Sequence, residues 1–316
     1  MKYIEHFNLT HLNTPLQRLN FKPASNQIFV KRDDLTGIEL SGNKVRKLDF
    51  LLKEAIDQGA TRIITCGGLQ SNHCRATAFA ATKLGLKTTL VLKSSSPQIM
   101  VTGNLLLNKI VNADIKIISN EEYQNVDEIM AELSANYTEN CYIIPEGGSN
   151  ARGAWGYVKA FEEIVNQMPD VDVVVVPTGS GGTHAGLLIG KWLMNHSCQI
   201  VSVNVCDDAP FFKQKIAGIV KDFKSQFAPD LQIVENEIEI VDGFVGAGYG
   251  QVTEKEITAI KSVAQNFGFL LDPVYTVKAW LGFEKLLADG FWQEKKIIFI
   301  HTGGVFSLFA YSQFFN

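Results

Sequence analysis

Lys44 lies in the segment SGNKVRK (41–47), where polar residues precede a stretch of helical character, LDFLLKEAIDQG (48–59). The pattern places Lys44 on the first turn of a helix. The positive end of the helix dipole disfavours an ammonium there and lowers the pKa of the amine. A lysine that forms a Schiff base with a carbonyl compound needs such a lowered pKa. Because most lysines at helix starts are solvated, Lys44 is a candidate only through the motifs that accompany it.

A glycine-rich loop follows VDVVVVP (171–177), a β-branched run that is typical of a strand buried on both faces. Glycines allow backbone N–H groups to converge on an anion, and the dipole of the following helix adds partial positive charge. The loop has no lysine at the P-loop position and does not match GxGxxG. It predicts a phosphate at a helix N-terminus, although a tight turn would use similar residues. The loop consists of Thr178, Gly179, Ser180, Gly181, Gly182 and Thr183.

Three further strand ends carry polar residues. Ser71 and Asn72 follow Gly67-Gly68 and either cap a helix or bind a carboxylate. Thr302 lies in HTGG (301–304) and is placed to hydrogen-bond a ring nitrogen. The tyrosines of VGAGYG and LLDPVYT, Tyr249 and Tyr275, are either packed in the core or part of the same site.

Strands and helices alternate from about residue 60, which predicts parallel sheets with right-handed crossovers. Expected strands are 61–66, 88–93, 115–119, 142–148, 171–177, 199–205 and 296–302, and a helix containing SLFAY ends the chain. We expect an α/β fold of two lobes, each a mainly parallel twisted sheet flanked by helices. Residues 51–150 form the small lobe, and residues 1–50 with 151–316 form the large, cofactor-binding lobe. Ligands in such folds lie at the carboxyl ends of strands.

The composition narrows the class of protein. The chain has 316 residues, 46% hydrophobic and 20% charged, with a formal net charge of −4. Without a basic cluster, nucleic-acid binding is not expected. No apolar run is long enough for a membrane helix, and residues 1–10 lack the apolar core of a signal peptide. Five unevenly spaced cysteines predict no metal site and favour a reducing, cytoplasmic location.

Eight motifs between residues 30 and 304 closely resemble one enzyme family when they are taken in order. The family is that of D-cysteine desulfhydrase and 1-aminocyclopropane-1-carboxylate deaminase, which belongs to the type II, tryptophan-synthase-β-like pyridoxal-phosphate enzymes. The resemblance implies this fold, pyridoxal 5'-phosphate as cofactor and a homodimer. The motifs are VKRDDLTG, SGNKVRKL, CGGLQSNH, PEGGSNARG, TGSGGTHAGL, GAGYG, LLDPVYT and FIHTGG.

The resemblance also implies roles for single residues. Lys44 looks like the Schiff-base lysine, and Lys47 and the loop 178–183 look like phosphate ligands. Asn72 would hydrogen-bond the ring hydroxyl of the cofactor, and Thr302 would face its pyridine nitrogen. Further implied residues touch the substrate: Ser71, Asn72, His73 and Thr276 as binding residues, with Ser71, Tyr249 and Tyr275 as catalytic residues beside Lys44.

The two branches of this family differ near the last tyrosine. The deaminases have a sequence similar to PVYEGK at this point, where this chain has PVYTVK with Thr276. They also have a leucine in the final glycine motif, where this chain has Thr302. Both residues resemble the desulfhydrase branch. Val277 departs from the usual glycine. The resemblance therefore implies β-elimination on a small D-amino acid, most simply D-cysteine, which gives pyruvate, hydrogen sulfide and ammonia.

Three alternatives stay open at the level of sequence. The first is another enzyme activity: a 1-aminocyclopropane-1-carboxylate deaminase, which would give 2-oxobutanoate and ammonia, or β-elimination from D-serine or β-chloro-D-alanine. The second is a non-catalytic protein that binds pyridoxal phosphate or an amino acid. The third is a nucleotide-binding protein that uses the glycine loop alone. It is poorly supported, because such proteins have an acidic partner for the ribose about 20 residues after the loop. The nearest acidic candidates here are Asp207 and Asp208.

Overall fold

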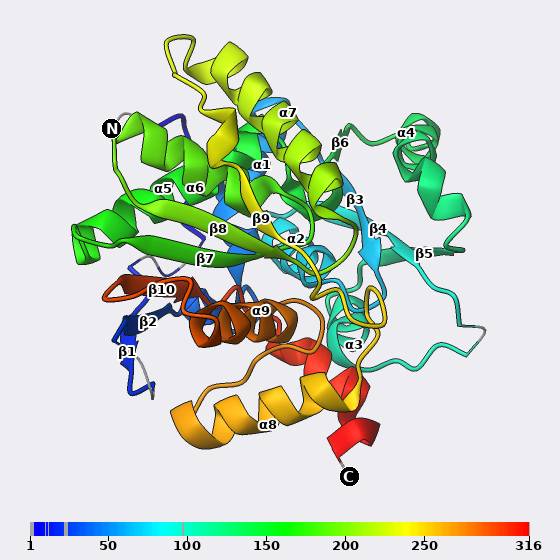
Figure 1. The fold of residues 1–316 in the computed structure, drawn as a ribbon. Coiled ribbons are helices and arrows are strands. Elements are labelled where there is room, and N and C mark those ends of the chain that lie inside the picture. The colour runs from blue at the N-terminus through cyan, green and yellow to red at the C-terminus, as the bar shows by residue number, and fades with distance from the viewer. Residues whose placement is uncertain (1–2, 10, 12, 22–24, 97, 316) are drawn as a thin grey trace.

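The computed structural model describes residues 3–9, 11, 13–21, 25–96 and 98–315. Its larger sheet has six strands in the order β1-β2-β10-β7-β8-β9 (Figure 1). Only β1 and β2 pair in antiparallel fashion, and every other neighbouring pair is parallel. In chain order the strands are β1 (Leu16–Leu19), β2 (Gln27–Lys31), β7 (Val173–Thr178), β8 (Gln199–Asn204), β9 (Glu239–Val241) and β10 (Lys296–Ile300).

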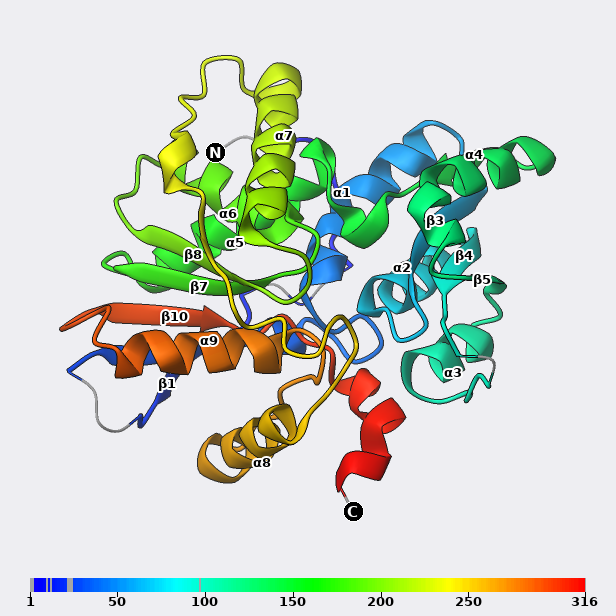
Figure 2. The same cartoon turned by 45° about the vertical axis from the view of Figure 1, so that its right-hand side comes forward.

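Helices cover both faces of the six-stranded sheet (Figure 2). Side chains alternate along a strand, so Val174 and Val176 of β7 face one hydrophobic cluster and Val173 and Val175 face the other. The first cluster includes α5 (Ala151–Gln167), α6 (Gly182–Leu193) and α7 (Ala209–Phe227). The second includes α8 (Glu254–Phe267) and α9 (Thr276–Ala288). Burial on both faces explains why the β7 sequence is continuously apolar rather than alternating.

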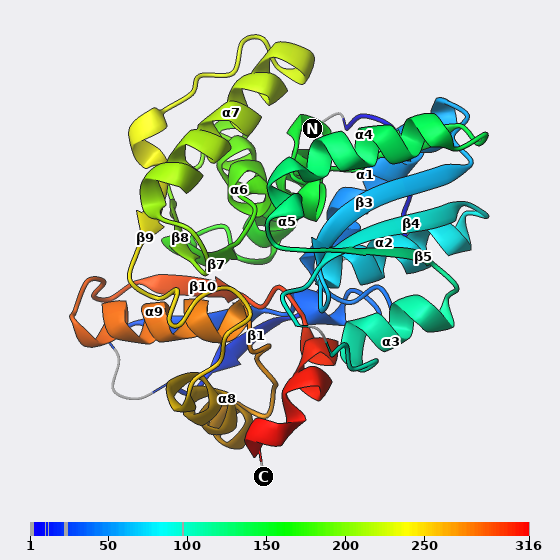
Figure 3. The same cartoon turned by 90° about the vertical axis from the view of Figure 1, so that its right-hand side faces the viewer.

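The smaller sheet has four parallel strands in the order β5-β4-β3-β6 (Figure 3). Leu90 and Leu92 pack against α2 and α3, while Ile64 and Val91 lie in the cluster of α4. The strands are β3 (Arg62–Gly68), β4 (Lys87–Lys93), β5 (Asp114–Ile118) and β6 (Cys141–Ile143), and the helices are α2 (Asn72–Lys83), α3 (Gly103–Ile110) and α4 (Val126–Asn136).

Helix α1 (Asn43–Asp57) connects the two sheets. Its Leu51 belongs to the cluster around α2, whereas its neighbour Phe50 belongs to the cluster of α5 and α6. The helix that starts at the candidate lysine is thus held by both halves of the molecule.

The α/β fold with two mainly parallel sheets is confirmed. All strands of the smaller sheet lie between residues 62 and 143. The division into lobes stays a prediction, and its boundary after residue 50 falls inside α1. The strand expected over 142–148 is wrong beyond Ile143, because the chain turns into the 3-10 helix η3 (Glu146–Gly148), in which Gly147 has a positive φ of 66°.

The sequence patterns also missed short elements at the edges. Strands β1, β2 and β9 were not expected, and the last helix is a 3-10 helix, η5 (Val305–Phe315). No helix within the described residues is long and apolar enough to cross a membrane. The remaining 3-10 helices are η1 (Asp33–Leu35), η2 (Glu122–Asn125) and η4 (Glu235–Glu237).

Candidate active site

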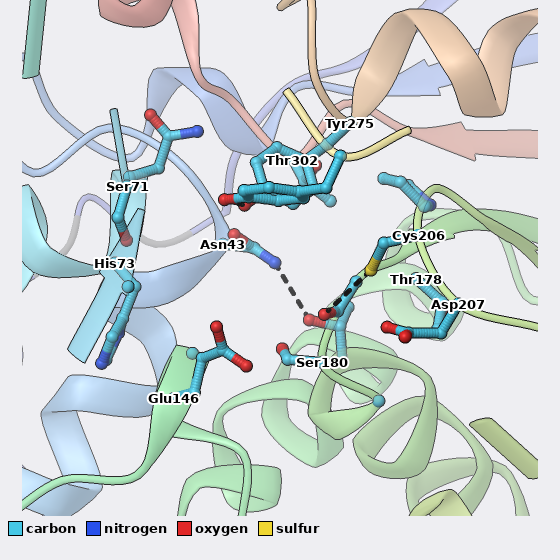
Figure 4. A pocket seen from close by; sticks show the side chains of 18 of the residues that line it. Asn43, Ser71, His73, Glu146, Thr178, Ser180, Cys206, Asp207, Tyr275 and Thr302 are labelled. Carbon is cyan, nitrogen blue, oxygen red and sulfur yellow. Dashed lines mark hydrogen bonds between the residues drawn. The ribbon is translucent and has the colours of Figure 1, made fainter. Parts of the chain in front are cut away.

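A cavity of about 370 Å³ lies where the carboxyl ends of β3, β7 and β10 meet the start of α1 (Figure 4). This is the position at which parallel α/β folds bind ligands. Most of the site residues that were predicted from sequence line this one cavity: Lys44, Ser71, Asn72, His73, Thr178, Gly179, Ser180, Gly181, Thr183, Tyr249, Tyr275 and Thr302.

Helix α1 begins directly against the end of β10. The N–H of Asn43 donates to the carbonyl of Thr302 at 3.1 Å. Gly42 precedes the helix with a φ of 104°, and a Cβ there would lie 2.7 Å from the same carbonyl oxygen. Only glycine allows this approach, so it fixes where Lys44 enters the cavity.

A buried ionic cluster around Arg46 stabilises the same end of α1. The Arg46 guanidinium donates to Asp33 Oδ1 at 2.7 Å and to Glu163 Oε2 at 2.9 Å, and Tyr157 donates to Asp33 Oδ2 at 2.6 Å. The carbonyl of Asp33 accepts from the N–H of Gly42 at 3.0 Å. The VKRDDLTG motif therefore supports the first turn of the helix that carries Lys44. Such a cluster needs every partner, because a single buried charge left alone is strongly destabilising.

The environment of Lys44 favours a neutral amine. Burial lowers the pKa of Lys44 to about 8, the nearby Glu146 carboxylate opposes this, and the Lys215 ammonium lowers the pKa further. A lysine with this pKa is a nucleophile and a base near neutral pH.

The glycine loop after β7 forms a polar cradle. Thr183 Oγ1 accepts from Asn43 Nδ2 at 3.0 Å, and Ser180 Oγ accepts from the Ser149 hydroxyl at 2.9 Å. The hydroxyl of Thr178 is buried and has no hydrogen-bond partner among the described residues. Gly181 has a φ of 81° and turns the chain into α6. Free donors at the start of a helix suit an anion.

Lys47 lies behind this loop, next to Gly182, and neither residue lines the cavity. Lys47 Nζ donates to the carbonyl of Gly147 at 3.2 Å and to Ser149 Oγ at 3.1 Å. A Cβ on Gly182 would lie 2.8 Å from Lys47 Nζ and 2.6 Å from Ser149 Oγ. Burial, then the Lys44 and Lys215 charges, lower the pKa of Lys47 well below its ordinary value. Direct contact of Lys47 with a phosphate stays a prediction.

The turn after β3 contributes the start of α2. Ser71 caps the helix, since its hydroxyl accepts from the N–H of Cys74 at 3.2 Å. Asn72 Oδ1 accepts from Asn104 at 2.8 Å, which turns the amide nitrogen of Asn72 away from Asn104.

The ring of His73 lies in a buried environment. Its Nε2 lies 2.8 Å from Thr65 Oγ1, and burial, followed by the charges of nearby lysines, lowers the pKa of His73 well below its usual value. His73 is therefore neutral at physiological pH.

Two tyrosines close the cavity on another side. The hydroxyl oxygens of Tyr249 and Tyr275 lie 2.7 Å apart, with the rings at 70° to each other. Burial raises the pKa of both phenols above their ordinary value. Both are neutral hydrogen-bond donors near neutral pH and are poorly suited to accept a proton.

Thr276 does not line the cavity, and its contact with a substrate stays a prediction without geometric support. Its side chain is fully buried. The hydroxyl donates to Asp272 Oδ1 at 2.7 Å and accepts from the N–H of Asp272 at 2.6 Å. Val277 is also fully buried and packs in the cluster of α8 and α9.

Several residues of the cavity wall escaped the sequence analysis. Asn43 adjoins Lys44, and Glu146 lies in a quoted motif, so both had a local signal. Lys93 is the last residue of β4, but no glycine or other polar motif accompanies it in the sequence. The other missed residues include Cys206, Phe211 and Lys215, and Asp207, named above only as a candidate ribose partner, also lines the cavity.

The residues fit pyridoxal phosphate. The cavity combines an amine of lowered pKa with a cradle of loop N–H groups and hydroxyls, one of which, Thr178, is buried without a partner. These are the two attachments that a phosphorylated aldehyde needs.

Comparison with known proteins agrees with this fit. One relative is a bifunctional D-cysteine desulfhydrase/1-aminocyclopropane-1-carboxylate deaminase, mitochondrial, of Arabidopsis thaliana, 40% identical over 96% of this chain and 79% of the relative. Another is a D-cysteine desulfhydrase of Yersinia pestis (strain Pestoides F), 38% identical over 94% of this chain and 93% of the relative. The crystal structure of an ACC deaminase homologue, 35% identical, superimposes with a TM-score of 0.88 over 98% of this chain and 95% of the other.

The chain also matches a protein family over most of its length. The family described as pyridoxal-phosphate dependent enzyme matches residues 8–303, which include every residue of the cavity wall. The chain belongs to the family of pyridoxal-phosphate dependent enzymes.

Proposed function

We propose that the protein catalyses β-elimination on a small D-amino acid, with D-cysteine as substrate and pyruvate, hydrogen sulfide and ammonia as products. The observation that carries the proposal is the Lys44 amine, whose pKa is lowered to about 8 in a cavity shared with a phosphate cradle and two neutral tyrosines. The relatives named as D-cysteine desulfhydrases support the choice of substrate.

In this proposal Lys44 holds the cofactor covalently and residues 178–183 hold its phosphate. Asn72 would offer its amide nitrogen to the ring hydroxyl, and the Thr302 hydroxyl would serve the ring nitrogen. A neutral hydroxyl at that nitrogen favours elimination over transamination. When bound, the cofactor supplies an electron sink for the carbanion that develops at Cα of the substrate.

The chain itself supplies binding and proton transfer. Ser71 and the N-terminus of α2 bind the substrate carboxylate with hydroxyl and backbone donors. The Lys44 amine accepts the Cα proton, because the raised pKa values of Tyr249 and Tyr275 keep both phenols protonated. One of the two hydroxyls donates its hydrogen to the other, and the second donates a hydrogen bond toward the β-substituent. Hydrosulfide leaves, and water converts the remaining three-carbon unit to pyruvate and ammonia.

A second candidate is 1-aminocyclopropane-1-carboxylate deaminase activity, which gives 2-oxobutanoate and ammonia. The name of the Arabidopsis thaliana relative favours it, because that protein is described as bifunctional. Thr302, which lines the cavity, is the remaining sequence argument for the desulfhydrase branch, since Thr276 lies outside the cavity wall.

A product assay tests the proposal. Protein loaded with pyridoxal phosphate is incubated with D-cysteine, L-cysteine or the cyclopropane amino acid, and sulfide and keto acids are measured. We expect sulfide and pyruvate from D-cysteine, and none from the Lys44→Ala variant, which also loses visible absorbance. Keto acid from the cyclopropane substrate alone would favour the deaminase. A yellow protein that converts none of the three would favour a non-catalytic binding protein.

We further propose a cytoplasmic homodimer with the lobe division given above. The support for a reducing compartment is that all five cysteines are free. Exposed apolar side chains on α3 and η5, among them Ile110 and Phe309, support a surface that is covered in an oligomer. Sedimentation of the purified protein tests the dimer, with a monomer as the contrary result.

A further inference from the structure

Lys93 is a cation of the cavity wall to which the proposed reaction assigns no task. It is the last residue of β4 and lines the cavity half-buried. Its Nζ lies 4.2 Å from the ring centroid of Tyr123 and 5.1 Å from that of Tyr249. Aromatic faces attract a cation and hold it in place without neutralising it.

The charge of Lys93 is not cancelled by an ion pair. Within the described residues, no carboxylate lies at ion-pair distance from its amine. Glu146, a carboxylate of the cavity wall, accepts a hydrogen bond from Tyr123 at 2.7 Å, and its charge raises the pKa of the Lys44 amine. A half-buried ammonium without a counter-ion attracts an anion from outside.

Two other lysines lie against the phosphate cradle. The cations near that loop are Lys47, behind Gly182, and Lys215, whose Cγ would lie 3.7 Å from a Cβ on Gly181. Lys93 instead adjoins the Tyr249 ring, which packs over Gly68 at the end of β3.

The position of Lys93 relative to the substrate follows from its neighbours. Tyr249 is hydrogen-bonded to Tyr275, the pair that faces the β-substituent in the proposed reaction. The Lys93 charge opposes the rise that burial causes in the pKa of the Cys206 thiol. Cys206 and Tyr275 border the same space (Figure 4). The contact of Lys93 with the Tyr249 ring thus places this cation on the side of the cavity where the tyrosine pair lies.

We infer that Lys93, with Tyr249, forms a subsite for an anionic β-substituent of the amino-acid substrate, and this inference rests on the proposed function. In the elimination the electron pair of the Cα–H bond forms the Cα–Cβ double bond, and the proton moves to the Lys44 amine. The Cβ–S bond breaks with its pair on sulfur. Lys93 balances the charge of the hydrosulfide until a solvent proton converts it to hydrogen sulfide.

Equilibrium binding of amino acids without a leaving group tests the subsite. D-Aspartate and D-asparagine have nearly the same shape and differ in the charge of the β-substituent, and D-alanine has no such substituent. Calorimetry on the pyridoxal-phosphate-loaded protein should give a dissociation constant about tenfold or more lower for D-aspartate than for D-asparagine. Lys93→Met should abolish this preference, and Lys93→Arg should retain it. Lys116→Met, an equal change of charge at an exposed position on β5, should leave it unchanged.

Other results overturn the inference. A wild-type protein without preference for D-aspartate contradicts an anion subsite. Equal weakening of all three ligands in Lys93→Met would mean that Lys93 binds the α-carboxylate instead. If D-alanine, D-asparagine and D-aspartate all fail to bind the wild type, the proposed function itself fails, and the subsite with it. Binding of D-alanine separates that case from failure of the subsite alone.

Discussion

The amine of Lys44 should react as a neutral nucleophile at a pH where ordinary lysines are almost fully protonated. Its pKa is lowered from 10.5 to about 8, chiefly by burial. At pH 8 about half of the Lys44 amines are neutral, compared with roughly 1 in 300 at a pKa of 10.5, a ratio of about 150. Because protonation removes the nucleophile, reactivity should rise about tenfold per pH unit up to pH 8 and then level off.

Trace acetylation measures this titration directly. Cofactor-free protein is labelled with a small amount of acetic anhydride at pH values from about 6 to 10.5, and the modified peptides are quantified by mass spectrometry. The exposed Lys116 provides a reference in the same digest. A midpoint above pH 10 for Lys44 would refute the argument from burial.

Two variants test the sign of the neighbouring charges. The Lys215 ammonium lowers the pKa of Lys44, so Lys215→Met should move the midpoint to higher pH. The Glu146 carboxylate raises it, so Glu146→Gln should move the midpoint to lower pH. Each movement should be roughly half to one pH unit for a partly screened unit charge. Movement of both midpoints in the same direction would contradict this electrostatic account.

Three further variants probe the frame of the site. Gly182→Ala should weaken pyridoxal-phosphate binding about tenfold or more in an absorbance titration, because the new methyl group displaces Lys47 or Ser149 from the loop. Gly218→Ala, where a methyl group meets nothing within 4 Å, is its control. Thr276→Val should lower the free energy of unfolding in urea by about 2–4 kcal/mol through two lost hydrogen bonds, and Thr276→Ser by only about 1 kcal/mol. Arg46→Met should cost about 3–5 kcal/mol in the same assay, because it leaves buried carboxylates unpaired; a loss below about 1 kcal/mol would contradict that view.

The parts of the site that sequence could predict are those with a local signal. Lys44 lies on the first turn of the helix that follows Gly42, and the loop 178–183 comes directly after the apolar run 173–177 of strand β7. Each motif could be placed at the carboxyl end of a strand or the start of a helix without knowledge of the tertiary structure. The alternation of elements then predicted that these ends meet.

The residues that sequence missed depend on packing between distant segments. Lys215 lies in the middle of the amphipathic helix α7, where a lysine ordinarily indicates a solvated face. It reaches the cavity because α7 packs over the glycine loop, with Ile216 beside Gly181. Lys93 became a candidate only through its contacts with the rings of Tyr123 and Tyr249, which come from other parts of the chain. Neither contact has a signature in the local sequence.

Thr276 illustrates how a residue outside the cavity can still influence the chemistry. The buried Asp272 carboxylate accepts hydrogen bonds from the N–H of Tyr275 at 3.0 Å and from the Thr276 hydroxyl at 2.7 Å. A Cβ on Gly304, two residues beyond Thr302, would lie 2.6 Å from the Cβ of Asp272. Asp272 therefore couples the backbone of Tyr275 to the loop that carries Thr302. A change at residue 276 would therefore alter the turn that positions Tyr275 in the cavity wall, even though the Thr276 side chain lies outside the cavity.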